Sequence, residues 1–222
     1  MRTNIIKVRM FKFFSSSNIF FLIQKLIKFI SSIFFLILII ALTFALILSP
    51  PDYIQGDSVR IMYVHVPSAW LGLACFSFIT LLSIVNFIFK IKNFYFISKS
   101  IAPIGLLFTC LAIVTGSLWG QPTWGTWWAW DARLTSMLVL MVFYIFYILV
   151  FKTIKEERLK IKVSSIVAIV GSINLPIIKY SVEWWSTLHQ PASIKITGSS
   201  AIHSTMLLPL VAMLFVFLLY AA

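Results

Sequence analysis

Six long apolar runs restrict this 222-residue sequence to one class of fold. Each run is close to the length that an α-helix needs to cross about 30 Å of hydrocarbon. The runs are Phe29–Leu48, Val66–Phe89, Ile101–Leu118, Leu134–Phe151, Val163–Tyr180 and Ala201–Tyr220. With 61% hydrophobic and only 11% charged residues, the chain is not a soluble domain. The sequence therefore predicts an all-α, polytopic membrane protein with six transmembrane helices.

Basic residues set the expected orientation of these helices. Most of the 18 Lys and Arg residues precede the first run or lie in the two loops that would share its side of the membrane. By the positive-inside rule that side is cytoplasmic, so both termini are predicted to be cytoplasmic. The net charge of +12 is then a topology signal, and no nucleic-acid site is expected. We divide the chain into a basic cytoplasmic lead-in, residues 1–28, and a six-helix membrane domain, residues 29–222.

The outward-facing loop after the third run holds the most unusual stretch, Trp119–Asp131, with the sequence WGQPTWGTWWAWD. Tryptophan gathers at membrane interfaces as an aromatic belt, which explains one or two residues per helix end. Five tryptophans in thirteen residues favour instead a platform for a large planar ligand or an aromatic partner. Gly120, Pro122 and Gly125 are expected to interrupt a helix here. Residues 124–131 can still form two turns, and one face of them would carry Trp124, Trp127, Trp128 and Asp131.

All three histidines are also expected on the outer side. His65 lies just ahead of Pro67, where the second helix should begin. His189 should share a helical face with Trp185, and His203 is expected within the last helix. Two neutral imidazoles, those of His65 and His189, can hold a haem iron axially between aromatic surfaces. The alternative for each histidine is an interfacial side chain that bonds to nearby backbone, and for His203 we favour that alternative.

Two arginines on the same side are candidates for contact with an anionic group. Arg60 and Arg133 can pair with carboxylates in fork geometry, which suits haem propionates. They can equally anchor the protein to lipid phosphate. Asp131 is not predicted to be a general base, because nothing beside it in the sequence resembles a nucleophile or a metal cluster.

The motifs around these residues resemble one known family. Residues 119–136 follow the pattern WGxxxWGTWWxWDxRLTS, which resembles the tryptophan-rich WWD signature of the haem-handling protein family. The six-span size, HVPSAW from His65 onward and EWWSTLHQP around His189 resemble one branch of that family, cytochrome c maturation protein C (CcmC), also called haem exporter protein C. The similarity extends over nearly the whole chain from the first span onward.

The resemblance implies a protein that handles haem b at the outer, periplasmic face of a bacterial inner membrane. It implies delivery to the haem chaperone CcmE in system I cytochrome c maturation, with the transporter subunits CcmA and CcmB, the small protein CcmD and membrane lipid as partners. This role is binding and delivery, not catalysis. By position, His65 and His189 match the axial ligands of the haem iron. The haem-presenting domain that the resemblance implies contains Trp119, Trp124, Trp127, Trp128, Trp130 and Asp131; a propionate role for Arg60 and Arg133 is inferred from their chemistry.

Two other functions fit a six-helix protein with outer histidines. A b-type haem electron-transfer subunit usually holds its histidines deeper within the helices and keeps its haem. A permease subunit that exports haem or another solute would be expected to place charged residues within its spans, and the middle of each predicted span has none.

Overall fold

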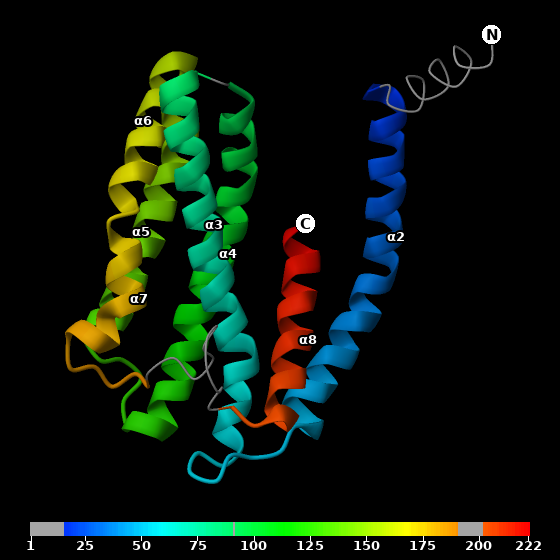
Figure 1. Ribbon diagram of the computed structural model, residues 1–222, viewed down its shortest axis with the longest axis vertical. Helices are drawn as coiled ribbons and strands as arrows, with labels where there is room; N and C mark the ends of the chain where they lie inside the picture. The colour runs from blue at the N-terminus through cyan, green and yellow to red at the C-terminus, as the bar shows by residue number, and fades with distance from the viewer. Residues whose placement is uncertain (1–15, 91, 191–201) are drawn as a thin grey trace.

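The computed structural model describes residues 16–90, 92–190 and 202–222, which form a bundle of helices (Figure 1). The elements in chain order are α2 Ser16–Thr43, the π-helical turn η1 Phe44–Leu48, the 3-10 turn η2 Asp57–Ile61, α3 Met62–Phe89, α4 Lys92–Trp124, α5 Ala132–Thr153, α6 Glu157–Gly171, α7 Asn174–Trp184 and α8 Ser204–Ala221. Six stretches of the described residues are long and apolar enough to cross a membrane, with α6 and α7 together forming one of them. The predicted all-α, six-span fold is therefore confirmed.

The first five spans are longer than the apolar runs that predict them, whereas α8 is slightly shorter than its run. Of the lead-in, residues 1–15 lie outside the described part of the chain, and residues 16–28 form the start of α2. The helices α5 and α6 extend into the basic sequence after the fourth run, and only residues 154–156 separate them. Long basic side chains reach water from a helix that continues past the hydrocarbon, so charge alone does not mark the helix end.

A break divides the fifth span between Gly171 and Asn174. The helix α6 ends at Gly171, a turn follows, and α7 begins at Asn174. The Asn174 side chain is buried, and its Nδ2 donates to the carbonyl of Ser136 on α5 at 2.8 Å. This hydrogen bond joins the start of α7 to α5.

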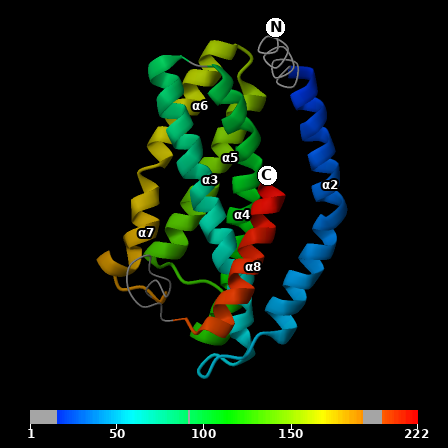
Figure 2. The ribbon, with the colours of Figure 1, turned by 45° about the vertical axis from the view of Figure 1, so that its right-hand side comes forward.

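The helices form a packed group with one loosely attached member. The most extensive contact is between α3 and α4, and α5 packs against α4, α6 and α7. The helix α8 lies between α3 and α2, and α2 diverges from the bundle toward its N-terminal end in both views (Figures 1 and 2). Accordingly, 11% of the most apolar window of the first span is buried, against 44% in the span that contains α3.

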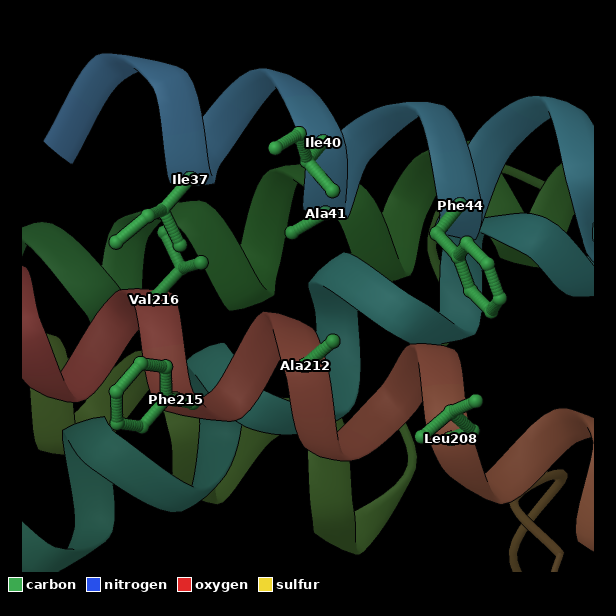
Figure 3. A pocket seen from close by; sticks show the side chains of 8 residues that line it. All are labelled: Ile37, Ile40, Ala41, Phe44, Leu208, Ala212, Phe215 and Val216. Atoms are coloured by element: carbon green, nitrogen blue, oxygen red, sulfur yellow. The ribbon is translucent and has the colours of Figure 1, made fainter. Parts of the chain in front are cut away.

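A shallow apolar groove of about 250 Å³ separates α2 from α8 (Figure 3). The side chains that line it come from both helices and are Ile37, Ile40, Ala41, Phe44, Leu208, Ala212, Phe215 and Val216. An apolar surface of this kind suits contact with lipid acyl chains in a spanning protein.

The buried side chain of Tyr144 connects three helices, α3 through a hydrogen bond and α4 through close packing against its own helix α5. The hydroxyl of Tyr144 on α5 donates to the carbonyl of Gly72 on α3 at 2.6 Å, and the Tyr144 side chain is fully buried. Gly105 on α4 lies against the same phenol, so closely that a Cβ at this position would overlap the hydroxyl and the ring. The absence of a side chain at Gly105 is what lets α4 approach the other two helices here.

We predict that Gly105→Ala destabilises the protein by about 1 to 3 kcal/mol, because the added methyl group displaces a buried ring in a packed core. The measurement is thermal unfolding in detergent, followed by circular dichroism. Leu107→Ala, at a side chain of the same helix that is 46% exposed, is the matched control. A Gly105→Ala variant as stable as the control would contradict the packing described for Tyr144.

Candidate functional site

The candidate site lies where α3 and α5 begin and where α4 and α7 end, at the lower end of the bundle in Figure 1. We call this the site end. All eight tryptophans of the chain belong to the described residues, and seven of them lie in the last turns of α4, in residues 125–131 or at the end of α7. The two stretches of irregular backbone that frame the site are 125–131, after α4, and 185–190, after α7, which we call the post-α7 segment.

His65 lies within α3, and the prediction that Pro67 starts this helix is wrong. The 3-10 turn η2 passes directly into α3 at Met62, so the helix is already formed when it reaches the proline. Pro67 removes one backbone donor in the second turn, a position at which the helix continues because the turns before it are already hydrogen-bonded. His65 is consequently held by a helix and not by a loop.

The His65 ring is oriented by α4. Its Nδ1 lies 2.9 Å from the carbonyl oxygen of Ala112 and 3.2 Å from the Thr115 hydroxyl. A carbonyl oxygen only accepts, so Nδ1 carries the proton in the neutral ring and Nε2 keeps its lone pair. Gly116 makes room for this arrangement, because a Cβ there would lie 2.9 Å from the His65 Cε1.

Trp119 covers the edge of the same imidazole. The two ring centroids are 5.8 Å apart, at an interplanar angle of 71°. The indole is itself fixed, since its Nε1 donates to Oε1 of Gln55 in the loop between the first two spans at 2.9 Å. The helix α4 thus contributes both the hydrogen-bond acceptor and the aromatic neighbour of His65.

The predicted helical shelf from Trp124 to Asp131 is wrong. The helix α4 continues through Gly120 and Pro122 to Trp124, and Gly125, at a φ of 76°, ends it. The Gly125 amide still bonds to the carbonyl of Gln121 at 3.0 Å, which is the usual way in which a left-handed glycine terminates a helix. The residues that follow are not helical, so Trp127, Trp128 and Asp131 do not share one helical face.

The five tryptophans of this stretch divide into two groups. Trp119 and Trp124 are half-buried against the histidines, whereas Trp127 is 58% and Trp130 is 78% exposed. Trp128 is half-buried and packs edge-on against Trp130, with 5.5 Å between ring centroids. One group therefore lines the site, and the other presents indole surface to the surroundings.

His189 belongs to the post-α7 segment, and its predicted helical pairing with Trp185 is wrong. The helix α7 ends at Trp184, and Trp185 is extended, with a φ of −135° and a ψ of 156°. The His189 ring packs instead against Trp124, with 4.9 Å between the ring centroids. Each of the two candidate ligands thus contacts one indole from the last turns of α4.

Asp131 connects the post-α7 segment to α5. Its Oδ1 accepts from the Leu134 amide at 2.8 Å and caps the N-terminus of α5, a position that favours aspartate. Its Oδ2 accepts from the Leu188 amide at 3.3 Å and lies 3.6 Å from Nδ1 of His189. The carboxylate therefore holds the segment that carries His189 against the start of α5.

The two candidate arginines bond to the protein's own backbone. Arg60 donates to the carbonyls of Leu46 and Ser49 at 2.8 and 3.1 Å, and so caps the end of the first span. Arg133 donates from Nε to the Ser181 hydroxyl at 3.0 Å and from an Nη to the carbonyl of Lys179 at 3.3 Å. Arg60 thus connects the turn η2 to the end of the first span, and Arg133 connects α5 to α7. The sequence did not predict these contacts.

His203 stands apart from this arrangement. It was expected within the last helix but is the N-cap of α8, where its exposed ring accepts weakly from the Thr205 amide at 3.4 Å. A capping role explains this histidine without a ligand.

Burial and nearby charges change the pKa of His189. The Arg133 charge acts on His189. Burial lowers the pKa of His189 from its ordinary value of 6.5; the Asp131 carboxylate opposes this and Arg133 adds to it. The net direction is downward, so the His189 ring is neutral at pH 7.

Several residues that shape the site were missed by sequence reasoning. Gly116 is not among the candidate residues of the sequence, yet it makes room for an imidazole. Ala112 acts through its carbonyl and Leu188 through its amide, and the identity of a side chain gives no signal for a backbone contact. Nothing in the sequence around Gln55 predicted that its side chain would accept a hydrogen bond from Trp119.

The fold and the site define a class: a polytopic membrane protein that gathers two neutral imidazoles and a group of indoles where its helices end. The comparisons with known proteins agree. The chain belongs to the haem exporter protein C family, because the family model with the description "Heme exporter protein C" matches residues 9–222.

Three relatives illustrate the similarity. "Heme exporter protein C" of Bradyrhizobium diazoefficiens is 39% identical over 172 residues, 78% of this chain and 65% of that protein. The protein of the same name from Escherichia coli K12 is 38% identical over 174 residues, 78% of this chain and 70% of its own length. A "Putative cytochrome c biosynthesis ccmC-like mitochondrial protein" of Marchantia polymorpha is 40% identical over 174 residues, 78% and 71% of the two chains. The chain thus spans less than two thirds of the first of these relatives.

The lowered pKa of His189 predicts how stability depends on pH. The His189 side chain titrates near 6.5 in the unfolded chain, while its ring in the folded protein resists protonation. Protonation of His189 therefore does not reduce the free energy of unfolding above pH 6.5, and reduces it increasingly as the pH falls below this value. The midpoint of thermal unfolding in detergent should therefore fall more steeply between pH 7.5 and about 5.5 for the wild type than for His189→Gln. Equal slopes for the two proteins would show that His189 is not protected from protonation.

Proposed function

We propose that this protein binds haem b transiently through the axial ligands His65 and His189 and delivers it to a haem chaperone during cytochrome c maturation. The observation that carries the proposal is the pairing of each histidine with an indole from the end of α4, Trp119 with His65 and Trp124 with His189. Two neutral imidazoles suit axial ligation of haem iron, and indoles suit the faces and edges of a porphyrin.

The donor set supports haem in preference to a bare metal ion. Among the residues that the structure describes, no group of three His, Cys, Asp or Glu side chains is placed to bind a metal. A haem iron already has four nitrogen ligands from its porphyrin, so it requires only two more from the protein. The tautomer that Ala112 imposes on His65 leaves Nε2 available for this bond.

Buried polar atoms without partners also support a ligand at the site end. Trp128 Nε1, Thr187 Oγ1 and His189 Nδ1 are buried and have no hydrogen-bond partner among the described residues. All three belong to the irregular stretches that frame the site. Orphaned donors of this kind cost free energy unless something satisfies them, and a bound ligand that reshapes these stretches would do so.

We propose Arg60 and Arg133 as partners of the haem propionates, although both already make hydrogen bonds within the protein. Arg133 acts electrostatically on His189, and its side chain is half-buried. Arg60 already faces Asp57 at 3.2 Å and two backbone carbonyls. We therefore assign the stronger propionate contact to Arg133 and regard Arg60 chiefly as the residue that fixes the loop beneath Trp119.

The exposed indoles support the delivery step. Trp127 and Trp130 project from the site end, next to the candidate ligand site. Large aromatic side chains on an exposed surface are typical of protein interfaces. We propose that they, with Trp128, dock the chaperone CcmE, while the transporter subunits CcmA and CcmB and the small protein CcmD associate with the membrane helices.

The distribution of charge supports the orientation of the protein. Most of the basic residues of the sequence precede α2, lie in its first half, or lie toward the ends of helices opposite the site end. The positive-inside rule assigns that side to the cytoplasm. We therefore propose that the site end, with the tryptophan-rich stretch, faces the periplasm of a bacterial inner membrane. A chaperone in that compartment would have direct access to the exposed indoles.

We predict that His65→Ala and His189→Ala each abolish the six-coordinate, low-spin absorption spectrum of the purified haem-loaded protein, because each removes one axial ligand. His203→Ala, the third histidine at this end, is the matched control and should retain the spectrum. Retention of the low-spin spectrum in both alanine variants would overturn the assignment. Haem that cycles between redox states but never passes to a chaperone would favour an electron-transfer subunit instead.

A second prediction separates binding from delivery. The double substitution Trp127→Ala and Trp130→Ala should leave the haem spectrum intact and reduce haem transfer to added chaperone about tenfold or more, the loss expected when interface hot spots are truncated. Trp70→Ala, on α3 and 38% exposed, should transfer haem as the wild type does. Equal transfer rates for the double variant and the control would contradict the docking role.

A further inference from the structure

The two candidate iron ligands face acceptors of different charge. His65 Nδ1 donates to the carbonyl of Ala112, a neutral group within a helix. His189 Nδ1 faces the Asp131 carboxylate at 3.6 Å, and this buried nitrogen has no other hydrogen-bond partner among the described residues. A shift of about half an ångström would bring the pair to hydrogen-bonding distance.

Asp131 is well placed to act on His189, because its own position is fixed twice. Oδ1 is held by the Leu134 amide at the first turn of α5, and Oδ2 accepts from Leu188, the residue that precedes His189. The carboxylate is 8% exposed, so water competes little for it. Arg133, the nearest cation in the sequence, directs its Nε and one Nη to α7.

Resting on the proposed function, we infer that Asp131 is the positioning residue of His189 and makes it the stronger of the two iron ligands. A carboxylate that accepts from Nδ1 selects the tautomer whose Nε2 lone pair is free. It also raises the basicity of that lone pair, since the developing positive charge on the ring is stabilised by the anion. The carbonyl that faces His65 selects the same tautomer but adds less donor strength, because charge-assisted hydrogen bonds are the stronger class.

The two histidines should release haem iron in a fixed order. When the bond from iron to one histidine breaks, the weaker ligand leaves first, so haem should remain on His189 after His65 has released it. The ligand that persists is carried by the post-α7 segment, beside Trp124, and the ligand that leaves first is carried by α3. The indoles at the site end then surround a haem held from one side only.

The first test uses Asp131→Asn, which preserves side-chain size and an acceptor for the Leu134 amide, since asparagine is as good an N-cap as aspartate. We expect the haem-loaded variant to remain low-spin, with a higher midpoint potential of the haem iron and altered g-values in electron paramagnetic resonance. Glu183→Gln removes an exposed negative charge on α7 and is the control for a general charge effect. A potential and g-values equal to those of the wild type, or an equal shift in the control, would overturn the inference.

The second test compares haem retained after purification by His65→Gly and His189→Gly. We expect His65→Gly, which keeps the ligand beside Asp131, to bind haem about 10- to 100-fold more tightly than His189→Gly, the range typical for loss of an outer-shell partner. Adding Asp131→Asn to each should remove most of this difference. Equal affinities of the two glycine variants would overturn the inference while leaving the proposed function intact; a low-spin spectrum that survives in both would instead reject the two histidines as ligands.

Discussion

Within the hydrocarbon of a membrane, backbone groups must be hydrogen-bonded within the protein, because no water is present to bind them. This constraint limits a site made of irregular backbone to the ends of the helices. Within the membrane the chain is helical almost throughout, and the irregular stretches 125–131 and 185–190 both lie at the site end. Irregular backbone supplies the free amides and the varied side-chain directions that a binding site requires. The site therefore occupies the place where helices end, and its members come from parts of the sequence that are far apart.

The helix α4 organises that site. Its last turns provide the carbonyl of Ala112 and the indole of Trp119 for His65, and the indole of Trp124 for His189. Gly116 allows the close approach of α3, and Gly125 ends the helix where the chain turns toward Asp131. A single rigid element thus sets the position of both imidazoles, and the two differ mainly in what faces their Nδ1 atoms.

The sequence predicted the number of spans well because hydrophobicity over a window depends on composition, not on detailed contacts. It failed at the helix ends. Pro67 looked like a helix start, yet the turn η2 had already begun the helix at Met62, and two turns of helix expected from Trp124 were prevented by a left-handed Gly125. The approach of His189 to Asp131 was not predictable, because it joins residues 58 positions apart through an irregular segment.

The family resemblance located the residues of interest, but not their arrangement. Arg60 and Arg133 stood out as cations beside an outer site, and only the structure showed that each is bonded to backbone or to a serine hydroxyl. Sequence patterns report which side chains are present and give little information on which groups already satisfy them. The same limit applies to Trp128, whose buried Nε1 has no hydrogen-bond partner within the described part of the chain, which only the folded chain shows.

The placement of His189 on a short non-helical stretch has a mechanical result. The contacts that hold this stretch come from Asp131, just before α5, and from Trp124 at the end of α4, so the position of His189 is set by neighbouring helix ends and not by α7 itself. Under the proposed function, one axial ligand then depends on an irregular segment and the other on a helix, so the two can be displaced independently of each other.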